Sequence, residues 1–348
     1  MTTKKISSLL AISCLFSLLV LGGLGCKKEV NTGGIFKSTN KGETWERKVF
    51  IKEEDKKQIT IGALEINKII QDNLNQNSFF LATSNGIYGT DNGGENWIKI
   101  ALSGSITDLD IDPTNSSTLV VTQGNLIFKT QENFAGIDNI YTNPDNSNVV
   151  SIIIDTYNPQ RYFAATKSGL LIVSQDGGQT WSTLNQFNQT IKKIVQAKSD
   201  TRVLYAITAK SLFMSTDAGN SWEEISTGLK EFSKAKYINH IAIDPTNYAH
   251  FYLATDFGIL ESLNGGQTYE PLKTLVATGV ISIQSIFINP NNINELYFPV
   301  NRVIHKSTDR GLSWETIEAI ESTGQVNYII VDKNDSNIIY AGLKPITK

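Results

Sequence analysis

This chain of 348 residues would have to do any chemistry with carboxylates, hydroxyls and tyrosines, because it has only three histidines and two cysteines. That scarcity excludes zinc fingers, iron–sulfur clusters and histidine-based metal triads. The sequence also lacks a nucleophile elbow, a P-loop and a dinucleotide fingerprint. We therefore expect no metal and no cofactor. A net charge of −3 with 19% charged residues indicates a globular protein that does not bind nucleic acid.

Two acids and two histidines are the first candidates for catalysis. Asp108 and Asp110 alternate with apolar residues in TDLDIDP, and His240 and His305 lie in strand-like segments. Glycoside hydrolysis needs a pair of carboxylates, and acids from distant segments cannot be paired by their spacing. We interpret the two acids as exposed or blade-capping groups and the histidines as partly buried polar residues. We therefore assign no catalytic residue.

The first 26 residues have the layout of a bacterial lipoprotein signal. Two lysines precede an uncharged apolar run that ends in Gly-Leu-Gly-Cys, which resembles a lipobox. We expect Cys26 to carry the lipid, residues 1–25 to be the signal peptide and residues 26–32 to hold the lipidated cysteine and a short tether. The protein would then be exported and anchored to the cell envelope by its acyl chains, on the outer leaflet of the plasma membrane or on an outer membrane where the host has one.

An eight-residue pattern, S/T-x-D/N-x-G-x-T/S/N-W/Y, recurs along the rest of the chain. Six copies are clear, and a decayed seventh, LIFKTQENF, lies midway in the 84-residue gap between Trp97 and Trp181. The other spacings, 41 to 52 residues, fit the period of propeller blades. The hydroxyl, Asp or Asn, glycine and aromatic positions of the six copies are Ser38, Asn40, Gly42 and Trp45; Thr90, Asn92, Gly94 and Trp97; Ser174, Asp176, Gly178 and Trp181; Ser215, Asp217, Gly219 and Trp222; Ser262, Asn264, Gly266 and Tyr269; and Ser307, Asp309, Gly311 and Trp314.

This motif has the composition of a tight hairpin turn. Its glycine can adopt a positive φ, and its hydroxyl, Asp or Asn can accept hydrogen bonds from N–H groups a few residues on. The aromatic residue would be buried beneath the hairpin. Because Asn replaces Asp in half of the clear copies, we expect a structural role and no calcium site.

Strand-like segments surround every copy, two before the motif, one entering it and one after it. After the tether the chain begins with a hairpin that lacks its first two strands, and it ends with two strands, VNYIIVD and NIIYAGL, that lack a hairpin. Pairing these segments would complete one blade and close the ring without exposed strand edges. The sequence therefore predicts an all-β fold, a single seven-bladed β-propeller of four-stranded antiparallel blades over residues 33–348.

The repeated motif resembles the Asp-box, or BNR repeat, of sialidases, sortilin-type receptors, xyloglucanase-like enzymes and the photosystem II assembly and stability factor family. The resemblance implies that the hairpins lie at the blade periphery, away from the central channel where ligands bind. A sialidase would hold a carboxylate with three arginines and carry an Arg-Ile-Pro signature, which is absent here. The chain after the signal has only five scattered arginines: Arg47, Arg161, Arg202, Arg302 and Arg310.

Among the resembled families, the photosystem II assembly factor type agrees best in length, lipid anchor and single seven-bladed body. That family binds a membrane-protein precursor through a patch of arginines, which this chain lacks, so only a general scaffold role carries over. We expect a non-catalytic, monomeric lipoprotein that presents its propeller to another envelope protein. The alternative is a surface-glycan binding protein, or a sialidase-like glycoside hydrolase that acts on extracellular carbohydrate.

Two irregular segments are candidates for contact with a partner. The charged run KEEDKK at 52–57 is expected to be a solvated loop. The stretch FAGIDNIY replaces a standard hairpin turn in the decayed copy. Because insertions in repeats gather on loops, we predict a candidate binding loop at Phe134, Ile137 and Tyr141.

Overall fold

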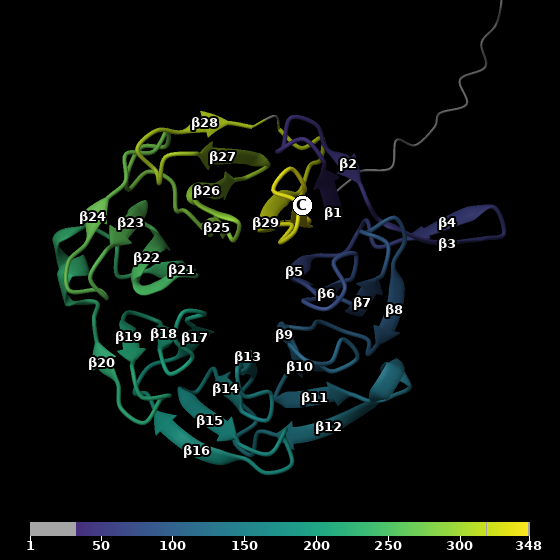
Figure 1. The fold of residues 1–348 in the computed structure, drawn as a ribbon, viewed down its shortest axis with the longest axis horizontal. Helices are drawn as coiled ribbons and strands as arrows, with labels where there is room; N and C mark the ends of the chain where they lie inside the picture. Colours follow the sequence, from purple (N-terminus) through teal and green to yellow (C-terminus); the bar gives the residue numbers. More distant parts are fainter. Residues whose placement is uncertain (1–32, 318, 347–348) are drawn as a thin grey trace, which may run out of the picture. The chain divides into compact units, whose positions relative to one another are not determined.

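The computed structural model describes residues 33–317 and 319–346. The predicted signal peptide, Cys26 and the tether lie outside the described residues. Within the described part, seven four-stranded antiparallel sheets surround a central channel, and a two-stranded hairpin projects from the ring (Figure 1). The helical elements of this part are two 3-10 turns, η1 (Glu132–Phe134) and η2 (Thr227–Glu231). None of its helices is long and apolar enough to cross a bilayer.

Each blade is a sheet of four strands stacked from the channel outward, and six of the seven use consecutive strands. Those six blades, with their strands in order from the channel outward, are β5 (Ile66–Gln71), β6 (Phe79–Thr83), β7 (Gly86–Thr90) and β8 (Ile98–Ala101); β9 (Asp108–Ile111), β10 (Leu119–Gln123), β11 (Leu126–Thr130) and β12 (Ile137–Thr142); β13 (Val149–Ile154), β14 (Tyr162–Thr166), β15 (Leu170–Ser174) and β16 (Ser182–Gln186); β17 (Ile191–Gln196), β18 (Leu204–Thr208), β19 (Leu212–Ser215) and β20 (Glu223–Glu224); β21 (Ile238–Asp244), β22 (Asn247–Thr255), β23 (Ile259–Ser262) and β24 (Glu270–Pro271); and β25 (Phe287–Asn289), β26 (Asn292–Val300), β27 (Val303–Ser307) and β28 (Glu315–Thr316).

The seventh blade joins the two ends of the described chain. Its order is β29 (Gln325–Val331), β30 (Ile339–Lys344), β1 (Gly34–Ser38) and β2 (Glu46–Arg47). All five residues of β1 pair with β30, from Gly34 opposite Leu343 to Ser38 opposite Ile339. The predicted seven-bladed propeller, closed by the N-terminal hairpin and the C-terminal strands, is therefore confirmed.

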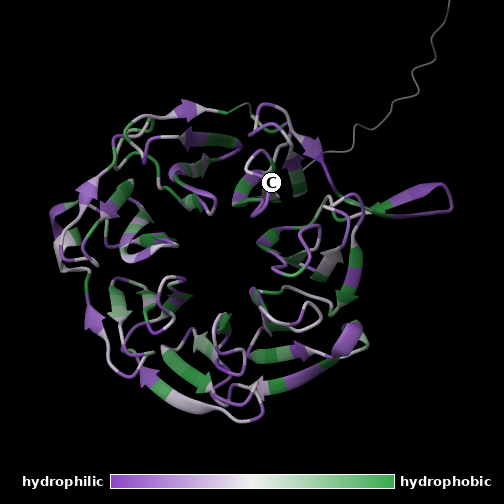
Figure 2. Ribbon diagram, in the orientation of Figure 1, coloured by the Kyte–Doolittle hydropathy of each residue, from purple (hydrophilic) through white to green (hydrophobic). Residues whose placement is uncertain are grey.

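The core lies between neighbouring blades, where apolar strand residues face one another and polar residues are left to the loops (Figure 2). At one equivalent position of the second strand, most blades carry a large aromatic side chain that is fully or almost fully buried. Two of the tyrosines at this position also donate hydrogen bonds to backbone carbonyls, Tyr340 to Gly93 at 3.0 Å and Tyr205 to Tyr248 at 2.7 Å. Residues at this position are Phe80, Phe163, Tyr205, Tyr252, Tyr297 and Tyr340.

The charged run at 52–57 is a hairpin, which corrects the prediction of a loop. Strand β3 (Phe50–Glu54) pairs with β4 (Lys57–Thr60), and the hairpin extends outward from the ring (Figure 1). Asp55 and Lys56 form its turn with φ values of 49° and 60°. Its residues from Lys52 to Gln58 are exposed, so the solvation of this segment is as expected although its backbone is regular.

The inner strands all run in the same direction along the channel. Side chains near their starts meet one another, as Lys68 and Asp108 do, and side chains just past their ends meet in the same way, as Lys333 and Asn73 do. We call the face where the inner strands begin the N-face and the face where they end the C-face. The described chain starts on the N-face, because Gly34 pairs with Leu343, which itself pairs with Val326 near the start of β29.

Candidate binding site in the central channel

The Asp-box hairpins are closed by hydrogen bonds within each hairpin. Ser174 Oγ accepts from the Gly178 N–H and donates to Asp176 Oδ1, both at 2.8 Å. Asp176 in turn accepts from the Thr180 N–H at 2.9 Å and from the Thr180 hydroxyl at 2.6 Å. These bonds from Thr180, and then the bond from Ser174, hold the pKa of Asp176 at about 2. Gly178 has a φ of 91°, which a side chain would resist.

Copies with Asn keep the same geometry without the charge. Asn40 Oδ1 accepts from the Thr44 N–H at 2.9 Å, and its amide donates to the Thr44 hydroxyl at 3.0 Å. An amide therefore replaces the carboxylate in this turn. Among the described residues, no group of three or more His, Cys, Asp and Glu is placed to hold a metal ion.

The aromatic residues close the hairpins from below. The indole N–H donates to the box glycine carbonyl in Trp222 at 2.9 Å and in Trp314 at 3.1 Å. Trp97 differs, because it is fully buried and donates at 2.9 Å to the Lys48 carbonyl of the preceding segment. Tyr269 donates to the Ile225 carbonyl at 2.8 Å. Trp97 and Tyr269 therefore bond their hairpins to a preceding segment of the chain, whereas Trp222 and Trp314 bond within their own hairpins.

The Asp-boxes lie on the C-face, at the outer half of their blades. The box turns contact the loops between first and second strands, as in the bonds from the Gly93 N–H to Asn77 at 2.9 Å and from the Gly177 N–H to Gln160 at 2.8 Å. The structure therefore distributes the six clear motifs around the rim and brings none of them to the channel. The decayed seventh copy holds η1 in place of the box, with positive φ at Asn133 and Phe134.

The channel is lined by three layers of side chains, set two and then three residues apart along each inner segment. In most blades, an acid or Asn directly before the third-layer residue holds the loop that follows the inner strand. Asp112 and Asp244, for example, each accept a hydrogen bond from the N–H two residues further on at 2.8 Å. From the N-face to the C-face, the layers are Lys68, Asp108, Ser151, Lys193, His240, Ser285 and Tyr328; then Ile70, Asp110, Ile153, Val195, Ala242, Phe287 and Ile330; and then Asn73, Pro113, Thr156, Lys198, Pro245, Pro290 and Lys333.

Asp108 is the centre of the first layer and joins four blades. Its carboxylate pairs with Lys68 at 2.9 Å and with Lys193 at 2.7 Å, and it accepts from the Ser151 hydroxyl at 3.0 Å. Burial alone would raise the pKa of this carboxyl, but the Lys193 and Lys68 ammonium groups hold it well below its usual range. Asp108 is thus a fully buried ionised group, not the exposed or capping acid that its sequence context predicts.

Asp110 is the polar member of the otherwise apolar second layer. Its carboxylate accepts from the Ile154 N–H at 2.8 Å and the Ile111 N–H at 3.1 Å. Burial raises the pKa of the Asp110 carboxyl, although Lys68 and the Ile154 N–H oppose the shift. Asp110 also faces the channel, so the prediction of an exposed or capping group is wrong for this acid as well.

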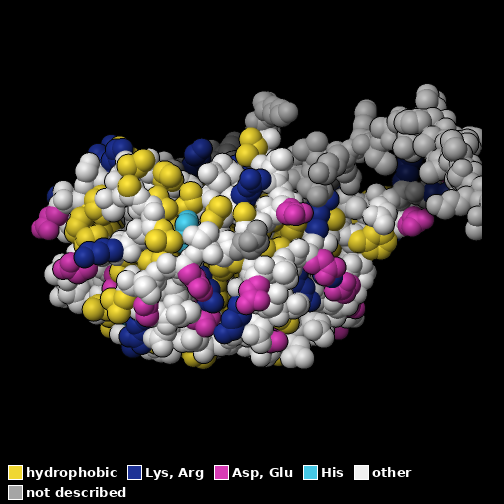
Figure 3. Space-filling model, turned by 90° about the horizontal axis from the view of Figure 1, so that it is seen from above, with side chains coloured by type: hydrophobic (Ala, Val, Ile, Leu, Met, Phe, Trp, Pro, Cys, Tyr) yellow, Lys and Arg dark blue, Asp and Glu magenta, His cyan; other side chains and the backbone are white. Residues whose placement is uncertain are grey.

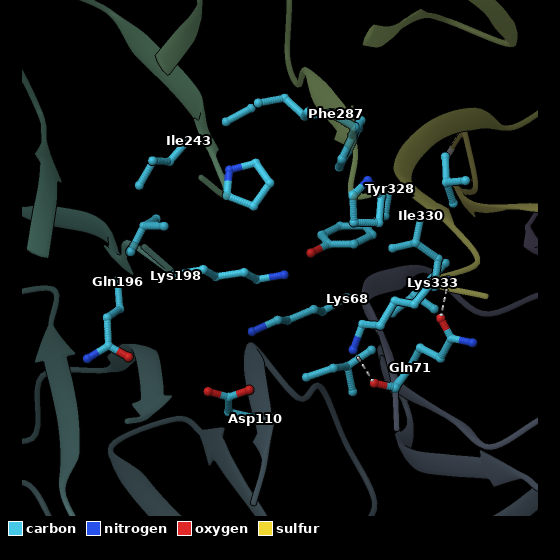
Figure 4. Close-up of a pocket in the computed structure, with 18 of the residues that line it drawn as sticks. Lys68, Gln71, Asp110, Gln196, Lys198, Ile243, Phe287, Tyr328, Ile330 and Lys333 are labelled. Atoms are coloured by element: carbon cyan, nitrogen blue, oxygen red, sulfur yellow. Dashed lines mark hydrogen bonds between the residues drawn. The ribbon is translucent and has the colours of Figure 1, made fainter. Parts of the chain in front are cut away.

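Two lysines lie at the C-face mouth of the cavity. The ammonium group of Lys198 points into the open space, and Lys333 lies at its edge, donating to the Gln71 carbonyl at 3.0 Å (Figure 4). Lys68 also lines the cavity, and its ammonium is paired with Asp108 at the N-face end. Desolvation in the channel and then the Lys198 ammonium lower the pKa of the Lys333 amine to about 8. Desolvation also lowers the pKa of Lys198, against the attraction of Asp110. Lys198 makes no hydrogen bond or ion pair with the described residues, and its exposed side chain lines the cavity, so its ammonium is available to a ligand.

Aromatic rings of β25 and β29 line the cavity on the side that also carries Lys333 (Figure 4). Phe287 packs edge-on against Tyr328 at 5.3 Å and also lies 5.2 Å from the His240 ring. Desolvation and then Lys193 lower the pKa of His240 to about 4, so its imidazole is neutral at pH 7. The cavity has a volume of about 520 Å³, within the range of ligand pockets. Among the described residues that line it, Asp110 supplies the one carboxylate.

The arginines and His305 lie elsewhere. Arg161 pairs with Asp155 and Arg202 with Asp200, and none of the five arginines lines the channel cavity. His305 is buried against Phe298, with ring centroids 4.7 Å apart. The cluster of three arginines that a sialidase would need is therefore not assembled in the described cavity.

The three residues of the candidate binding loop are half-buried. Phe134 packs on Phe80 at 5.6 Å, Ile137 packs against the same core, and Tyr141 packs on Trp181 at 5.5 Å. A second cavity of about 490 Å³ lies beside this segment. It is lined by polar neighbours that include Glu132, Asp138 and Lys129 from the decayed hairpin.

Sequence reasoning missed the channel layers. Lys68, Lys198 and Lys333 had no motif around them, and Tyr328 and Phe287 appeared as ordinary strand residues. A usable signal does exist, because six of the seven inner segments end in Asp or Asn. Aligning the segments at that residue places every channel-facing position in register.

The fold and the hairpins define a class of protein, the seven-bladed β-propeller of the Asp-box type. A family model of the BNR/Asp-box repeat matches residues 172–183, which include the motif at Ser174 to Trp181. With the ring of similar hairpins around it, this match identifies the chain as a BNR-type β-propeller. No curated protein matches the chain in sequence.

Solved structures with the same fold include both enzymes and a peptide-binding protein. The GH74 xyloglucanase from Xanthomonas campestris matches with a TM-score of 0.65 and 14% identity over 81% of this chain. This chain covers 51% of that enzyme and 41% of an ancestral GH74 enzyme, which is about half the length of such proteins. YCF48 bound to D1 peptide matches with a TM-score of 0.64 and 12% identity over 82% of this chain and 94% of that one. At these identities the likeness shows the fold.

Proposed function

We propose that this protein is a non-catalytic binding protein of the cell envelope, held there by a lipid on Cys26. Its propeller receives an anionic segment of another envelope protein in the C-face mouth of the channel. The observation that carries the proposal is the unpaired ammonium of Lys198 beside Lys333 at the rim of the 520 Å³ cavity. A carboxylate placed there would receive charge-assisted hydrogen bonds in a partly desolvated site.

The apolar lining of the cavity supports a peptide as the ligand. Phe287, Tyr328 and Ile330 offer apolar and aromatic surface on the side of the cavity that carries Lys333. A peptide segment with an acidic group next to an apolar side chain would satisfy both the lysines and this surface. The YCF48 structure contains a peptide of another protein, and that propeller is of nearly the same extent as this chain, which agrees with this class of ligand.

The arrangement of acids argues against hydrolysis of a glycoside. Both mechanisms of glycoside hydrolysis use two carboxylates at a defined separation across the sugar. Asp110 is the single carboxylate among the described residues of the cavity, and Asp108 is occupied by two lysines. The cavity therefore lacks a second acid to act with Asp110.

The proposal is tested by photo-crosslinking in cells, with the crosslinking residue at Thr156 or at Thr190. Both threonines are exposed, and they lie on the C-face and the N-face respectively, so they form a matched pair. We expect one recurrent envelope protein to be captured from Thr156 and not from Thr190. Lys198→Gln and Lys333→Gln should each weaken the capture about tenfold, the effect of a lost charge-assisted bond. Equal capture from both positions, or capture unaffected by the lysine variants, contradicts the proposal.

Glycan binding is the second candidate, because the rings of Phe287 and Tyr328 are placed to stack on a sugar. Purified protein titrated with cell-surface polysaccharide distinguishes the two. Binding that Phe287→Ala removes and Lys198→Gln leaves unchanged would favour the glycan. Release of reducing sugar that depends on Asp110 would favour a hydrolase.

A further inference from the structure

Four exposed apolar side chains gather on two neighbouring linkers of the N-face. Tyr237 ends the linker between β20 and β21, and its side chain is 39% exposed. Leu275, Val280 and Ile281 lie in the linker between β24 and β25, and they are 59%, 75% and 43% exposed. Contiguous exposed apolar surface of this kind marks a site of contact with another body.

The two linkers are held together as one surface. Lys234 Nζ donates to the Gly279 carbonyl at 3.2 Å, which joins the first linker to the second. Both also bond to the turn between β22 and β23, through the Asp256 N–H to Tyr237 at 3.2 Å and the Gly279 N–H to Phe257. The exposed side chains therefore stand on a fixed support.

Exposed lysines surround these apolar side chains. Lys230, Lys234 and Lys236 lie in the first linker and Lys273 in the second, and all four are exposed. Lys236 also lies over the Tyr237 ring at 5.1 Å. The acids of the same segments are Glu231 and Asp256, and Asp256 bonds to Asn239 at 3.0 Å. We call these eight residues, the four apolar side chains and the four lysines, the N-face patch.

The opposite face has a different character. Its exposed large apolar residues sit singly in loops of four different blades: Leu312 at 84%, Tyr157 at 74%, Leu263 at 66% and Leu74 at 59%. In the side view, hydrophobic side chains gather toward the upper left edge, and most acidic side chains lie below them (Figure 3).

The start of the described chain lies on the same face as the patch. Gly33 precedes β1 there, and Ile346, which is 52% exposed, follows β30 there. Only residues 27–32 separate Cys26 from Gly33, and they span roughly 20 Å at most. A lipid on Cys26 would therefore keep the N-face close to the bilayer.

We infer that the N-face patch is a membrane-contact surface, which inserts Leu275, Val280 and Ile281 among the headgroups of an anionic bilayer while its lysines bind lipid phosphates. Apolar side chains rimmed by lysine are the combination that binds such a surface. The inference rests on the proposed lipid anchor, which brings this face to the membrane. It leaves the channel mouth on the C-face directed away from the bilayer, toward a soluble or protruding segment of the partner.

Depth-dependent quenching tests the inference. The full chain is produced in a bacterial host, recovered in its processed form and incorporated into vesicles of phosphatidylcholine and phosphatidylglycerol with brominated acyl chains. A fluorophore is attached to a cysteine placed at Val280 or, as the matched control, at Leu312. Both positions are exposed aliphatic residues, on opposite faces. We expect strong quenching at Val280 and at most background quenching at Leu312.

Charge and lipid composition sharpen the result. Replacing Lys234, Lys236 and Lys273 by Gln should reduce the quenching at Val280, with about a fivefold loss of surface affinity for each lysine removed. Equal quenching at the two positions, or quenching at Leu312 alone, overturns the inference. Protection of Val280 by a co-purified protein in place of lipid also overturns it. The crosslinking at Thr156 reads the channel separately, so its failure leaves the quenching result to stand by itself.

Discussion

Aspartates occur at both the inner and the outer ends of the blades, but they differ in burial and in the range of their hydrogen bonds. At the channel, Asp108 is buried and bonded to residues of three other blades, and it is the one such group in the described part of the chain. At the rim, Asp309 and its counterparts are half-buried or exposed and bonded only within their own hairpins, and the arrangement recurs in six clear copies. The repeated feature is local and tolerates Asn, whereas the single feature is long-range and holds two lysines in place. The repeated residues of this molecule therefore form turns that are closed by local hydrogen bonds, and the site that could bind a ligand is built from residues that do not repeat.

The largest expected loss of stability comes from the apolar part of an Asp-box. Trp97→Ala removes a fully buried indole and should lower the free energy of unfolding by about 4 kcal/mol. Trp222, which is only partly buried, is the matched control and should cost clearly less on replacement by Ala. Denaturant unfolding measures both. Equal losses would mean that burial of the ring does not determine what each hairpin contributes.

The next largest effect is expected in the channel. Asp108→Asn leaves the Lys68 and Lys193 ammonium groups without their counter-ion and should cost about 3 kcal/mol. Asp110→Asn is the control, because burial raises the pKa of Asp110 and its carboxylate has no ion pair at hydrogen-bond distance. Chemical unfolding of the two variants should separate them clearly. If the Asp108→Asn and Asp110→Asn variants are equally stable, the long-range ion pairs of Asp108 do not stabilise the channel as proposed.

The pH dependence of ligand binding sharpens the contrast, since among the described residues an amine with a pKa near 8, that of Lys333, lies in the channel. Lys333 is charged below that value and neutral above it, so it attracts an anionic ligand only at the lower pH. Affinity for a partner peptide should fall up to about tenfold between pH 7 and pH 9. The Lys333→Arg variant keeps its charge over this range and should bind with a flatter profile. Titration calorimetry at both pH values decides this, and identical profiles would remove Lys333 from the site.

The smallest effect is expected for the acid of one Asp-box. Asp309→Asn keeps the acceptor for the Ser313 N–H, as Asn40 does for Thr44, so the loss of stability near pH 7 should be slight. Hydrogen bonds from Ser313 and then Ser307 hold the pKa of Asp309 at about 2, below its unfolded value. The carboxylate therefore stabilises the fold above the unfolded pKa, and this contribution disappears as the pH falls toward 2. Thermal unfolding of the variant should show less change between pH 5 and pH 2 than that of the parent chain.

The blade count, the hairpins and the closure could be predicted because each depends on local sequence that repeats. Ser174, Asp176 and Gly178 form a turn by contacts within five residues, so the motif alone indicates it. The charged hairpin at 50–60 was missed because its turn, Asp55-Lys56, has positive φ at two residues without glycine or asparagine to indicate it.

The channel could not be predicted because its contacts join residues that are far apart in the chain. Asp108 lies 40 residues from Lys68 and 85 residues from Lys193, and each lysine is ordinary in its own strand. The fold places them together only when the seven inner strands are brought into register. The alignment of those strands at their terminal Asp or Asn is a rule that other sequences of this class can test.

The pairing of β1 with β30 also bears on the order in which the molecule can be made. Some 300 residues separate Gly34 from Leu343, so the first hairpin leaves the ribosome long before its partner strands exist. Until then β1 has an unpaired edge, and the slow search for a distant partner becomes the last step of folding. A chain that stops before Ile339 would lose both its final strand and the anchorage of its first. Completion of synthesis is thus the event that locks the ring.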